Sequence, residues 1–508
     1  MLSVKRNEIH ECLKNSELYN NLMSDDIFEI LKKFHIPEEG IIIKSINDLI
    51  KYIRIIDYWG VDKTPNEIYK WVFDNKNIVI TSITILILEF PNFQLINEFK
   101  IIIESTNDNI CNNAAQNGFL ELLQYAHKNG YVWSIETCNI AAKFGKLDCL
   151  KYAHENGCQW FEEKICDIAA KYGHLNCLKY AHENKCPLYK YIFRIIAENG
   201  HLECLKYVHE NGCEWDKYTC IISAKFGHLN CLKYAHENGC EWLEKEYTCD
   251  YAALYGFLDC LKYAHENGCP WDKHICEHAA KNGHFECLKY AHENGCIWDE
   301  FTCNNAAYNG HLDCLMYAHE NGCPWNENTC KYAARNGHLE CLKYAHKNKC
   351  PFHVTKICEC AIEKDQLECL KYVYKNTAKK RRFKCLEYII KYSAKYGKIN
   401  CLNYAQENGY SWLIEKTCEY AAIYGQYHFL KYVHENGCPW NKKTCEYAAK
   451  YGKIECLKYA HENGCPWDEE TCRVATLYGE FECLNYAYEN GCPLHKEYIF
   501  MNKRARTK

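Results

Sequence analysis

The chain of 508 residues lacks the signatures of a secreted or membrane-bound protein. Its formal net charge at pH 7 is only −5, so no strong overall field attracts nucleic acid or a membrane surface. The first residues, Met1 to Glu8, contain no apolar segment of the kind a secretion signal needs. The longest apolar stretch, 78–90, is interrupted by Thr and Ser and is too short to span a bilayer. We therefore expect an intracellular, cytoplasmic protein with no membrane partner.

Catalytic and metal-binding motifs are also missing. The chain has no Gly-x-Ser-x-Gly, no phosphate-binding glycine-rich loop and no His-Glu-x-x-His. It has no Cys-x-x-Cys pair either, although His319 and Cys323 stand four residues apart, as two zinc ligands on one helix would. The phrase His-Glu-Asn-Gly-Cys recurs many times, which favours a structural role over one catalytic site. We expect no enzyme activity, no metal and no cofactor.

Cysteine is the residue that the chain has in excess, with 38 copies. In a reducing compartment most of these cysteines remain thiols, because disulfides persist mainly in oxidising environments. A free cysteine then behaves as a small apolar core residue with a weak hydrogen-bond donor. The composition therefore predicts a core built partly from thiols.

One phrase, of which Cys341-Leu-Lys-Tyr-Ala-His-Lys-Asn-Lys-Cys350 is a version, occurs fourteen times. Its spacing is 27 residues in most intervals, 28 or 29 in four and 32 in one. A fixed period of this size indicates stacked units that bury their apolar faces against each other. The phrase starts at Leu122, Cys149, Cys177, Cys204, Cys231, Cys260, Cys287, Cys314, Cys341, Cys369, Cys401, Phe429, Cys456 and Cys483.

Each unit has the pattern of two short helices. In the unit at 326–352, Asn328 or Thr329 is a candidate N-cap, and Cys330, Ala333 and Ala334 then form a narrow apolar stripe. Gly337 ends this helix, and a second helix presents Leu339, Leu342 and Ala345 on one face. A Pro-Trp connector precedes the next unit, and its Trp is expected to cover the seam between repeats. We predict an all-α solenoid with about fourteen clear units.

These residues resemble ankyrin repeats. Ala333-Ala-Arg-Asn-Gly-His-Leu-Glu340 is close to the ankyrin phrase between the two helices, and Tyr317-Ala-His-Glu-Asn-Gly322 is similar to the end of the second helix. Two features depart from the family: Thr329-Cys-Lys-Tyr332 replaces Thr-Pro-Leu-His, and each unit is about six residues shorter, which removes the β-hairpin finger. The cysteine-rich sequence of these repeats resembles that of the ankyrin-like proteins expanded in giant DNA viruses of amoebae. The resemblance implies binding to a host or viral protein.

The N-terminal region is open to two interpretations. Residues 1–47 fall outside the period and are expected to be mainly helical, and 48–105 contain two degenerate units whose bulky side chains suit terminal capping repeats. Alternatively, Asn47 to Val61 resembles the C-terminal part of a BTB domain. That resemblance implies an adaptor that recruits subunits of a cullin-type ubiquitin ligase. The repeat solenoid then spans 106–496.

Two segments are basic. The solenoid is irregular at 375–390, where about five extra residues bring six positive side chains together, most of them at 379–384. The tail at 497–508 is also basic. Either segment could contact phosphates or direct the chain to the nucleus, but the negative overall charge makes nucleic acid an unlikely partner.

The fourteen units can be compared with one another within the chain. The second helix hardly varies, whereas the residues after Trp and beside the first cysteine of each unit do. In an ankyrin-like stack these variable residues line the first-helix, concave side. We expect this face to select a partner protein and the uniform helices to act as the frame. The candidate partner-binding residues are Lys217, Tyr218, Tyr251, Lys273, His278, Phe301, Asn305, Lys331 and Tyr332.

Overall fold

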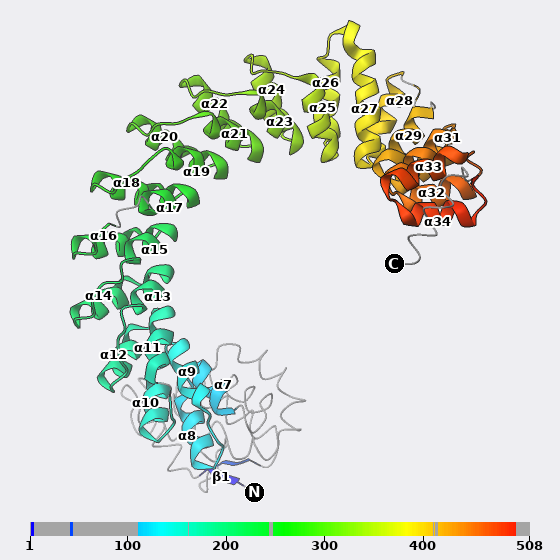
Figure 1. Cartoon of the computed structure of the whole chain (residues 1–508). Coiled ribbons are helices and arrows are strands. Elements are labelled where there is room, and N and C mark those ends of the chain that lie inside the picture. The colour runs from blue at the N-terminus through cyan, green and yellow to red at the C-terminus, as the bar shows by residue number, and fades with distance from the viewer. Residues whose placement is uncertain are drawn as a thin grey trace. The chain divides into compact units, whose positions relative to one another are not determined.

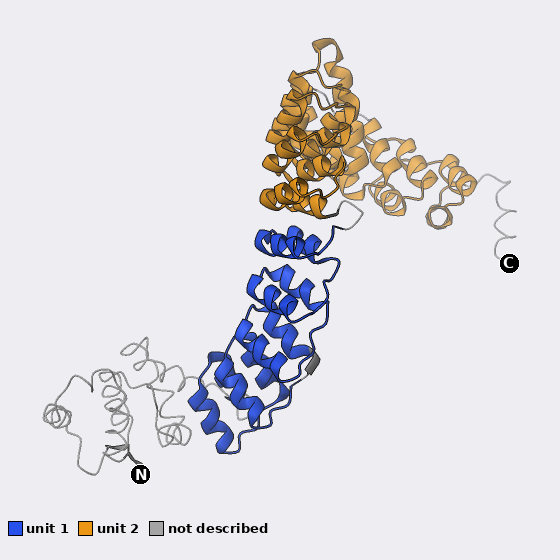
Figure 2. Cartoon of the chain, turned by 90° about the vertical axis from the view of Figure 1, so that its left-hand side faces the viewer, with its two compact units in different colours: residues 1–243 blue, residues 244–508 orange. Residues whose placement is uncertain are grey.

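The computed structural model describes residues 2–4, 41–43, 110–160, 162–242, 247–409, 411 and 415–493 (Figure 1). The chain divides into two units, 1–243 and 244–508, coloured separately in Figure 2. Of the segment 1–47, for which the sequence predicts mainly helix, the structure describes two strands, β1 (Leu2–Val4) and β2 (Ile41–Ile43). These strands pair antiparallel, with Ser3 opposite Ile42. The expected capping repeats at 48–105 and the basic tail lie outside the described residues.

Helices alternate along both units, as an all-α repeat solenoid requires. The described residues of the first unit form five helical pairs: α7 (Ile110–Asn117) with α8 (Leu120–Lys128), α9 (Ile135–Lys143) with α10 (Leu147–Glu155), α11 (Glu162–Lys171) with α12 (Leu175–Glu183), α13 (Ile192–Asn199) with α14 (Leu202–Glu210), and α15 (Thr219–Lys225) with α16 (Leu229–Glu237). Within this unit the odd-numbered helices, which are the first of each pair, form one layer and the even-numbered helices the other (Figure 1).

In the described part of the second unit, helices alternate in the same way and form nine pairs. They are α17 (Tyr247–Tyr255) with α18 (Leu258–Glu266), α19 (His274–Asn282) with α20 (Phe285–Glu293), α21 (Glu300–Asn309) with α22 (Leu312–Glu320), α23 (Glu327–Arg335) with α24 (Leu339–Lys347), α25 (Val354–Glu363) with α26 (Leu367–Lys375), α27 (Arg382–Tyr396) with α28 (Ile399–Glu407), α29 (Glu415–Tyr424) with α30 (Tyr427–Glu435), α31 (Lys442–Lys450) with α32 (Ile454–Glu462), and α33 (Glu469–Tyr478) with α34 (Phe481–Glu489). The fourteen pairs match the fourteen phrases in the sequence, so the predicted repeat architecture is confirmed.

Local signals set the ends of each first helix. In the unit at 326–352 the N-cap is Asn326, whose side chain accepts a hydrogen bond from the Asn328 amide at 2.9 Å. The sequence had suggested Asn328 or Thr329, but the residue directly after Trp has the extended backbone that an N-cap needs. Asp299, Asn441 and Asp468 cap their helices in the same way.

Glycine ends the first helix because the backbone turns left-handed there. At the end of α9, Gly145 has φ +69°, and the amides of Gly145 and Lys146 donate to Ala142 and Ala141 at 3.3 and 2.8 Å. This pair of bonds is the Schellman arrangement, which satisfies carbonyls at a helix end. The ring of His174 from the next repeat lies where it would collide with a Cβ of residue 145, and its Nε2 lies 3.0 Å from the Lys143 carbonyl. Gly145 therefore allows both the turn and the contact between repeats.

The core consists of small side chains from the first helices and larger ones from the second. Cys303, Ala306 and Ala307 of α21 are completely buried, as are Leu315 and Ala318 of α22. Small side chains allow helix axes to approach at the short end of the usual 8–10 Å range. Consecutive first helices accordingly pack closely against each other, whereas consecutive second helices touch sparsely.

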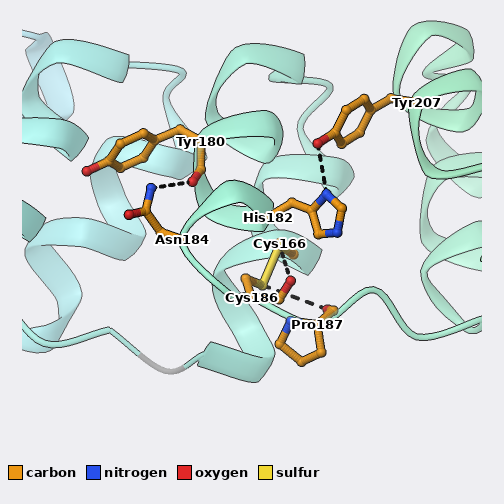
Figure 3. Close-up of a disulfide and its surroundings, with 7 residues drawn as sticks. All are labelled: Cys166, Tyr180, His182, Asn184, Cys186, Pro187 and Tyr207. Atoms are coloured by element: carbon orange, nitrogen blue, oxygen red, sulfur yellow. Dashed lines mark hydrogen bonds between the residues drawn. A yellow bond between two sulfur atoms is a disulfide. The ribbon is translucent and has the colours of Figure 1, made fainter. Parts of the chain in front are cut away.

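Within most repeats, a thiol of the first helix lies against the thiol twenty residues later, in the connector after the second helix. Cys418 and Cys438, for example, bring their Sγ atoms to 3.4 Å. Cys166 and Cys186 occupy the same two positions and are joined as a disulfide (Figure 3). The first thiol also donates to the backbone carbonyl of the second cysteine, at 3.7 to 4.0 Å, in Cys138–Cys158, Cys220–Cys240, Cys249–Cys269, Cys303–Cys323 and Cys418–Cys438. The same register holds Cys276–Cys296, Cys330–Cys350, Cys445–Cys465 and Cys472–Cys492.

The second helices carry another row of thiols. Burial raises the pKa of Cys260, Cys287 and Cys314 to about 12, so these cysteines are protonated at neutral pH. All free cysteines in the described part of the chain are buried except Cys213 and Cys360, which are partly exposed. The prediction that thiols form part of the core is thus confirmed.

Aromatic rings close the seam between repeats. In the repeat of α18, His265 stacks on Trp271 at 3.6 Å, and its Nδ1 is 3.1 Å from the Tyr290 hydroxyl of the following repeat. The same His–Tyr hydrogen bond recurs at 2.8 to 3.1 Å through both units, as Figure 3 shows for His182 and Tyr207. Burial lowers the pKa of His265, so its ring stays neutral near pH 7. The expected role of Trp as a cover for the seam is confirmed.

Replacing Gly145 by Ala is expected to destabilise the protein more than replacing Gly157, although both glycines have positive φ. A Cβ at 145 would collide with His174, whereas a Cβ at 157 meets no atom within 4 Å. The left-handed backbone alone costs about 1–2 kcal/mol, so Gly157→Ala should show that cost and Gly145→Ala a larger one. Thermal unfolding followed by circular dichroism measures both. Equal losses would contradict the contact between Gly145 and His174.

Among the residues that the structure describes, three that are not glycine adopt the left-handed backbone: Lys185, Lys349 and Asp365. Lys349, with φ +65°, occupies the position that Gly322 holds one repeat earlier. Replacing Lys349 by Gly removes this strain, and because glycine itself costs about 0.5–1 kcal/mol of backbone entropy, the net gain should be up to ~1 kcal/mol. Lys347→Gly, in the last turn of α24, is the matched control and should destabilise. Urea unfolding gives both values, and a loss of stability in Lys349→Gly would contradict the assignment.

Candidate protein-binding face

The variable residues of the second unit lie on its first helices. Tyr251 is on α17, His278 on α19, Phe301 and Asn305 on α21, and Lys331 and Tyr332 on α23. Their side chains are partly exposed, apart from Phe301, which is 53% exposed. Because consecutive first helices pack side by side, these positions form one continuous surface, which we call the first-helix face. The predicted residues of the second unit are therefore brought together.

Ion pairs join the first-helix face from one repeat to the next. His278 Nδ1 lies 2.6 Å from Asp250 Oδ1, and Arg335 Nη2 lies 2.5 Å from Glu363 Oε1. Farther along, Lys395 Nζ lies 2.8 Å from Glu359 Oε1. The hydrogen bond that His278 donates to the Asp250 carboxylate raises the pKa of His278, whereas burial lowers the pKa of His265 on the second helix. On acidification, His278 therefore becomes protonated at a higher pH than His265.

Exposed aromatic side chains lie among these charges. Tyr308 and Tyr332 meet edge to face with ring centroids 5.6 Å apart, and Tyr308 is 45% exposed. Tyr251 stacks near Tyr255, with centroids 6.3 Å apart. Partly exposed aromatic rings surrounded by polar groups are typical of protein-binding surfaces.

Two of the predicted residues are held by local pairs. Lys273 precedes α19, and its Nζ lies 2.8 Å from Oδ2 of Asp299, the N-cap of α21. Lys331 Nζ lies 2.7 Å from Glu327 Oε1 on its own helix. Both lysines thus fix neighbouring parts of the face, in addition to presenting charge.

Lys217 and Tyr218 belong to the first unit, where they precede α15. Arg194 lies over the Tyr218 ring at 4.5 Å and pairs with the buried Asp216 at 2.9 Å, and Lys217 lies over the same ring at 5.0 Å. They form a separate cationic and aromatic cluster.

Comparing the repeats within the sequence does not identify every residue of the first-helix face. Asp250, Tyr308 and Arg335 were not among the candidates, although Tyr308 and Arg335 stand four residues after variable positions, Asn304 and Lys331. A helix places such residues on one face, so helical periodicity would have found them.

The described residues contain neither a cluster of metal ligands nor a membrane-spanning helix. They contain no group of three or more His, Cys, Asp or Glu side chains that could hold a metal ion. His319 is engaged with Trp325 and Tyr344, and the Cys323 thiol lies 3.2 Å from the Asp299 carbonyl. None of the helices in these residues is long and apolar enough to cross a bilayer.

The His278–Asp250 pair predicts an elevated histidine pKa. Because this pKa is raised above the unfolded value of about 6.5, the stability that the pair contributes is present in full below pH 6.5 and is lost as the pH rises through the folded pKa. Asp250→Asn should lower the pKa of His278, measured by NMR titration of the imidazole signals with His278→Gln used to assign them. An unchanged His278 pKa in Asp250→Asn would show that the carboxylate is not the cause.

A match to a family model agrees with this architecture. Residues 303–346 match the family model described as ankyrin repeats in many copies. Among solved structures, the crystal structure of the human ASB11 ankyrin repeat domain aligns with 17% identity and a TM-score of 0.22, over 37% of this chain and 84% of that one. No curated protein matches.

The segment 303–346 is one stretch of a pattern that repeats through both units. It covers α21 to α24, whose Cys-Ala-Ala and Cys-Leu-Ala cores recur in the other helical pairs. Ankyrin repeats generally mediate protein–protein interactions. Over 303–346, the chain contains ankyrin repeats.

Proposed function

We propose that this protein is an intracellular scaffold that binds a host or viral partner protein through the first-helix face of its second unit. The observation that carries the proposal is the contrast between the two layers of helices. The second helices repeat nearly the same residues, whereas the first helices present a different set in each repeat. Across repeats these residues make one surface, bonded from Asp250 to His278 and from Arg335 to Glu363.

The chemistry of the face suits a folded protein better than a small molecule. Its described side chains form a row of partly exposed aromatic rings and ion pairs along consecutive helices instead of converging on one point. Binding energy at such surfaces concentrates in a few aromatic residues and arginines. Phe301 and Tyr308 are the largest exposed apolar groups on α21, and we assign them the central contacts.

Removing these two rings should release the partner. Affinity purification from host lysate, with mass spectrometry, compares the full chain with the double variant Phe301→Ser and Tyr308→Ser, and with Ile297→Ser as the matched control. Ile297 is 77% exposed but lies in the connector before Trp298, outside the face. We expect at least about tenfold less partner on the double variant and an unchanged amount on the control. Partners that remain on the double variant would overturn the assignment of the face.

The same experiment separates the adaptor alternative. The BTB-like segment lies outside the described residues, so its role is tested by removing 1–105. A scaffold that works through its repeats keeps its partners after this truncation. Ligase subunits that appear only with the full chain would support the adaptor function instead.

A further inference from the structure

The irregular repeat contains a pocket with a volume of about 450 Å³, which is in the size range of small-molecule sites. It lies between the start of α25 and the turn that leads into α27. Its lining includes Phe352 and His353 on one side and Arg381, Lys384 and Tyr388 on the other. The turn before α27 and the extended start of α27, which the regular repeats lack, thus form one wall of the pocket.

The extra residues of this repeat create that wall. After α26 the chain makes a short 3-10 turn (Lys379–Arg381) and enters α27 at Arg382. Arg382 turns back and donates hydrogen bonds to the carbonyls of Lys375 and Thr377 at 2.9 and 3.2 Å. The basic segment predicted at 379–384 is therefore a folded turn and a helix start, and it directs Arg381 and Lys384 to the pocket.

The pocket lining is cationic. Arg381 and Lys384 contribute positive charge, Thr355 and Thr377 contribute hydroxyl groups, and none of the residues that line the pocket is an aspartate or a glutamate. The rim also carries the start of α25, whose N-cap His353 makes no side-chain capping bond. The first amides of a helix have no partner within it and favour negative charge, which adds to the effect of the two cations.

The negative charge of Glu327, whose carboxylate contacts the rim of the pocket, is balanced by neighbouring cations. Glu327 Oε2 lies 3.2 Å from His353 Nε2, and Glu327 Oε1 lies 2.7 and 3.1 Å from the Nζ atoms of Lys331 and Lys356. These two lysines lower the pKa of Glu327 to about 2. One negative charge is therefore shared by two lysines and a histidine, and the surroundings of the pocket remain positive.

We propose that this pocket binds an organic phosphate monoester. Arg381 and Lys384 hold the phosphate oxygens, and the organic part packs against Phe352 and Tyr388. A phosphate monoester carries nearly two negative charges at neutral pH and three acceptor oxygens, which matches two separate cations with hydroxyl donors nearby better than a carboxylate does. Two aromatic residues in the lining favour a planar organic group.

Isothermal titration of the full chain with phenyl phosphate tests the proposal, with phenol and inorganic phosphate as partial ligands. We expect one phenyl phosphate per chain and weaker binding of both partial ligands. The double variant Arg381→Gln and Lys384→Gln should bind phenyl phosphate at least about tenfold more weakly. Lys379→Gln with Lys380→Gln removes the same charge from the same turn, but neither lysine lines the pocket. This matched variant should retain the affinity.

Three results would overturn the proposal: no binding of phenyl phosphate at millimolar concentration, unchanged binding in the Arg381 and Lys384 double variant, or equal losses in the two double variants. The last result would indicate a general charge effect. Thermal unfolding checks that each variant is folded. A tyrosine-phosphorylated peptide then identifies the source of the phosphate. Tighter binding of the peptide than of phenyl phosphate assigns the site to a phosphorylated partner, and equal or weaker binding assigns it to a free metabolite.

Discussion

Close packing between consecutive first helices is the contact on which the whole solenoid depends. A single pair of nine-residue helices cannot bury enough apolar surface to be stable, so each pair needs its neighbours. Cysteine and two alanines per first helix, such as Cys303, Ala306 and Ala307, present little bulk and are completely buried. Because consecutive first helices lie close together, residues at equivalent positions on neighbouring helices come within reach of each other. The ion pairs and tyrosine contacts of the first-helix face result from this.

The second helices are held in a different way. Their mutual contacts are sparse, and a network of His, Trp and Tyr covers the seam instead. Each histidine is bonded to the next repeat, while its stacked Trp comes from the connector of its own repeat. The network therefore links neighbours without demanding close approach of the helices. This explains why a sequence with His and Tyr on its second helices, Trp in its connectors and Ala on its first helices can form a regular stack.

Much of the fold could be predicted from the sequence because the repeat supplies many copies of each signal. In the unit at 326–352, for example, the first helix is predicted by the apolar stripe of Cys330, Ala333 and Ala334, and its end by Gly337. The predicted N-cap, Asn328 or Thr329, is two or three residues from the observed one, Asn326, because all three are acceptable caps by residue type and only the backbone distinguishes them. Thiol pairs twenty residues apart, such as Cys418 and Cys438, could not be predicted, because they depend on how the connector folds back onto the first helix. The pocket at Arg381 could not be predicted either, because a run of positive residues does not indicate which of their side chains line the same cavity.

The near identity of the contacts between repeats has a consequence for how such a chain can change in length. Loss or duplication of one 27-residue period joins a surface to an almost exact copy of its former neighbour, so the new junction has the same alanines, thiols and aromatic seam as the old one. A gene of this kind can therefore gain or lose whole repeats by unequal recombination without a fold-breaking intermediate. The repeat that contains α27 is the exception, because its 15-residue helix and preceding turn have no equivalent elsewhere in the described chain. Its removal would delete a feature that no other repeat can restore.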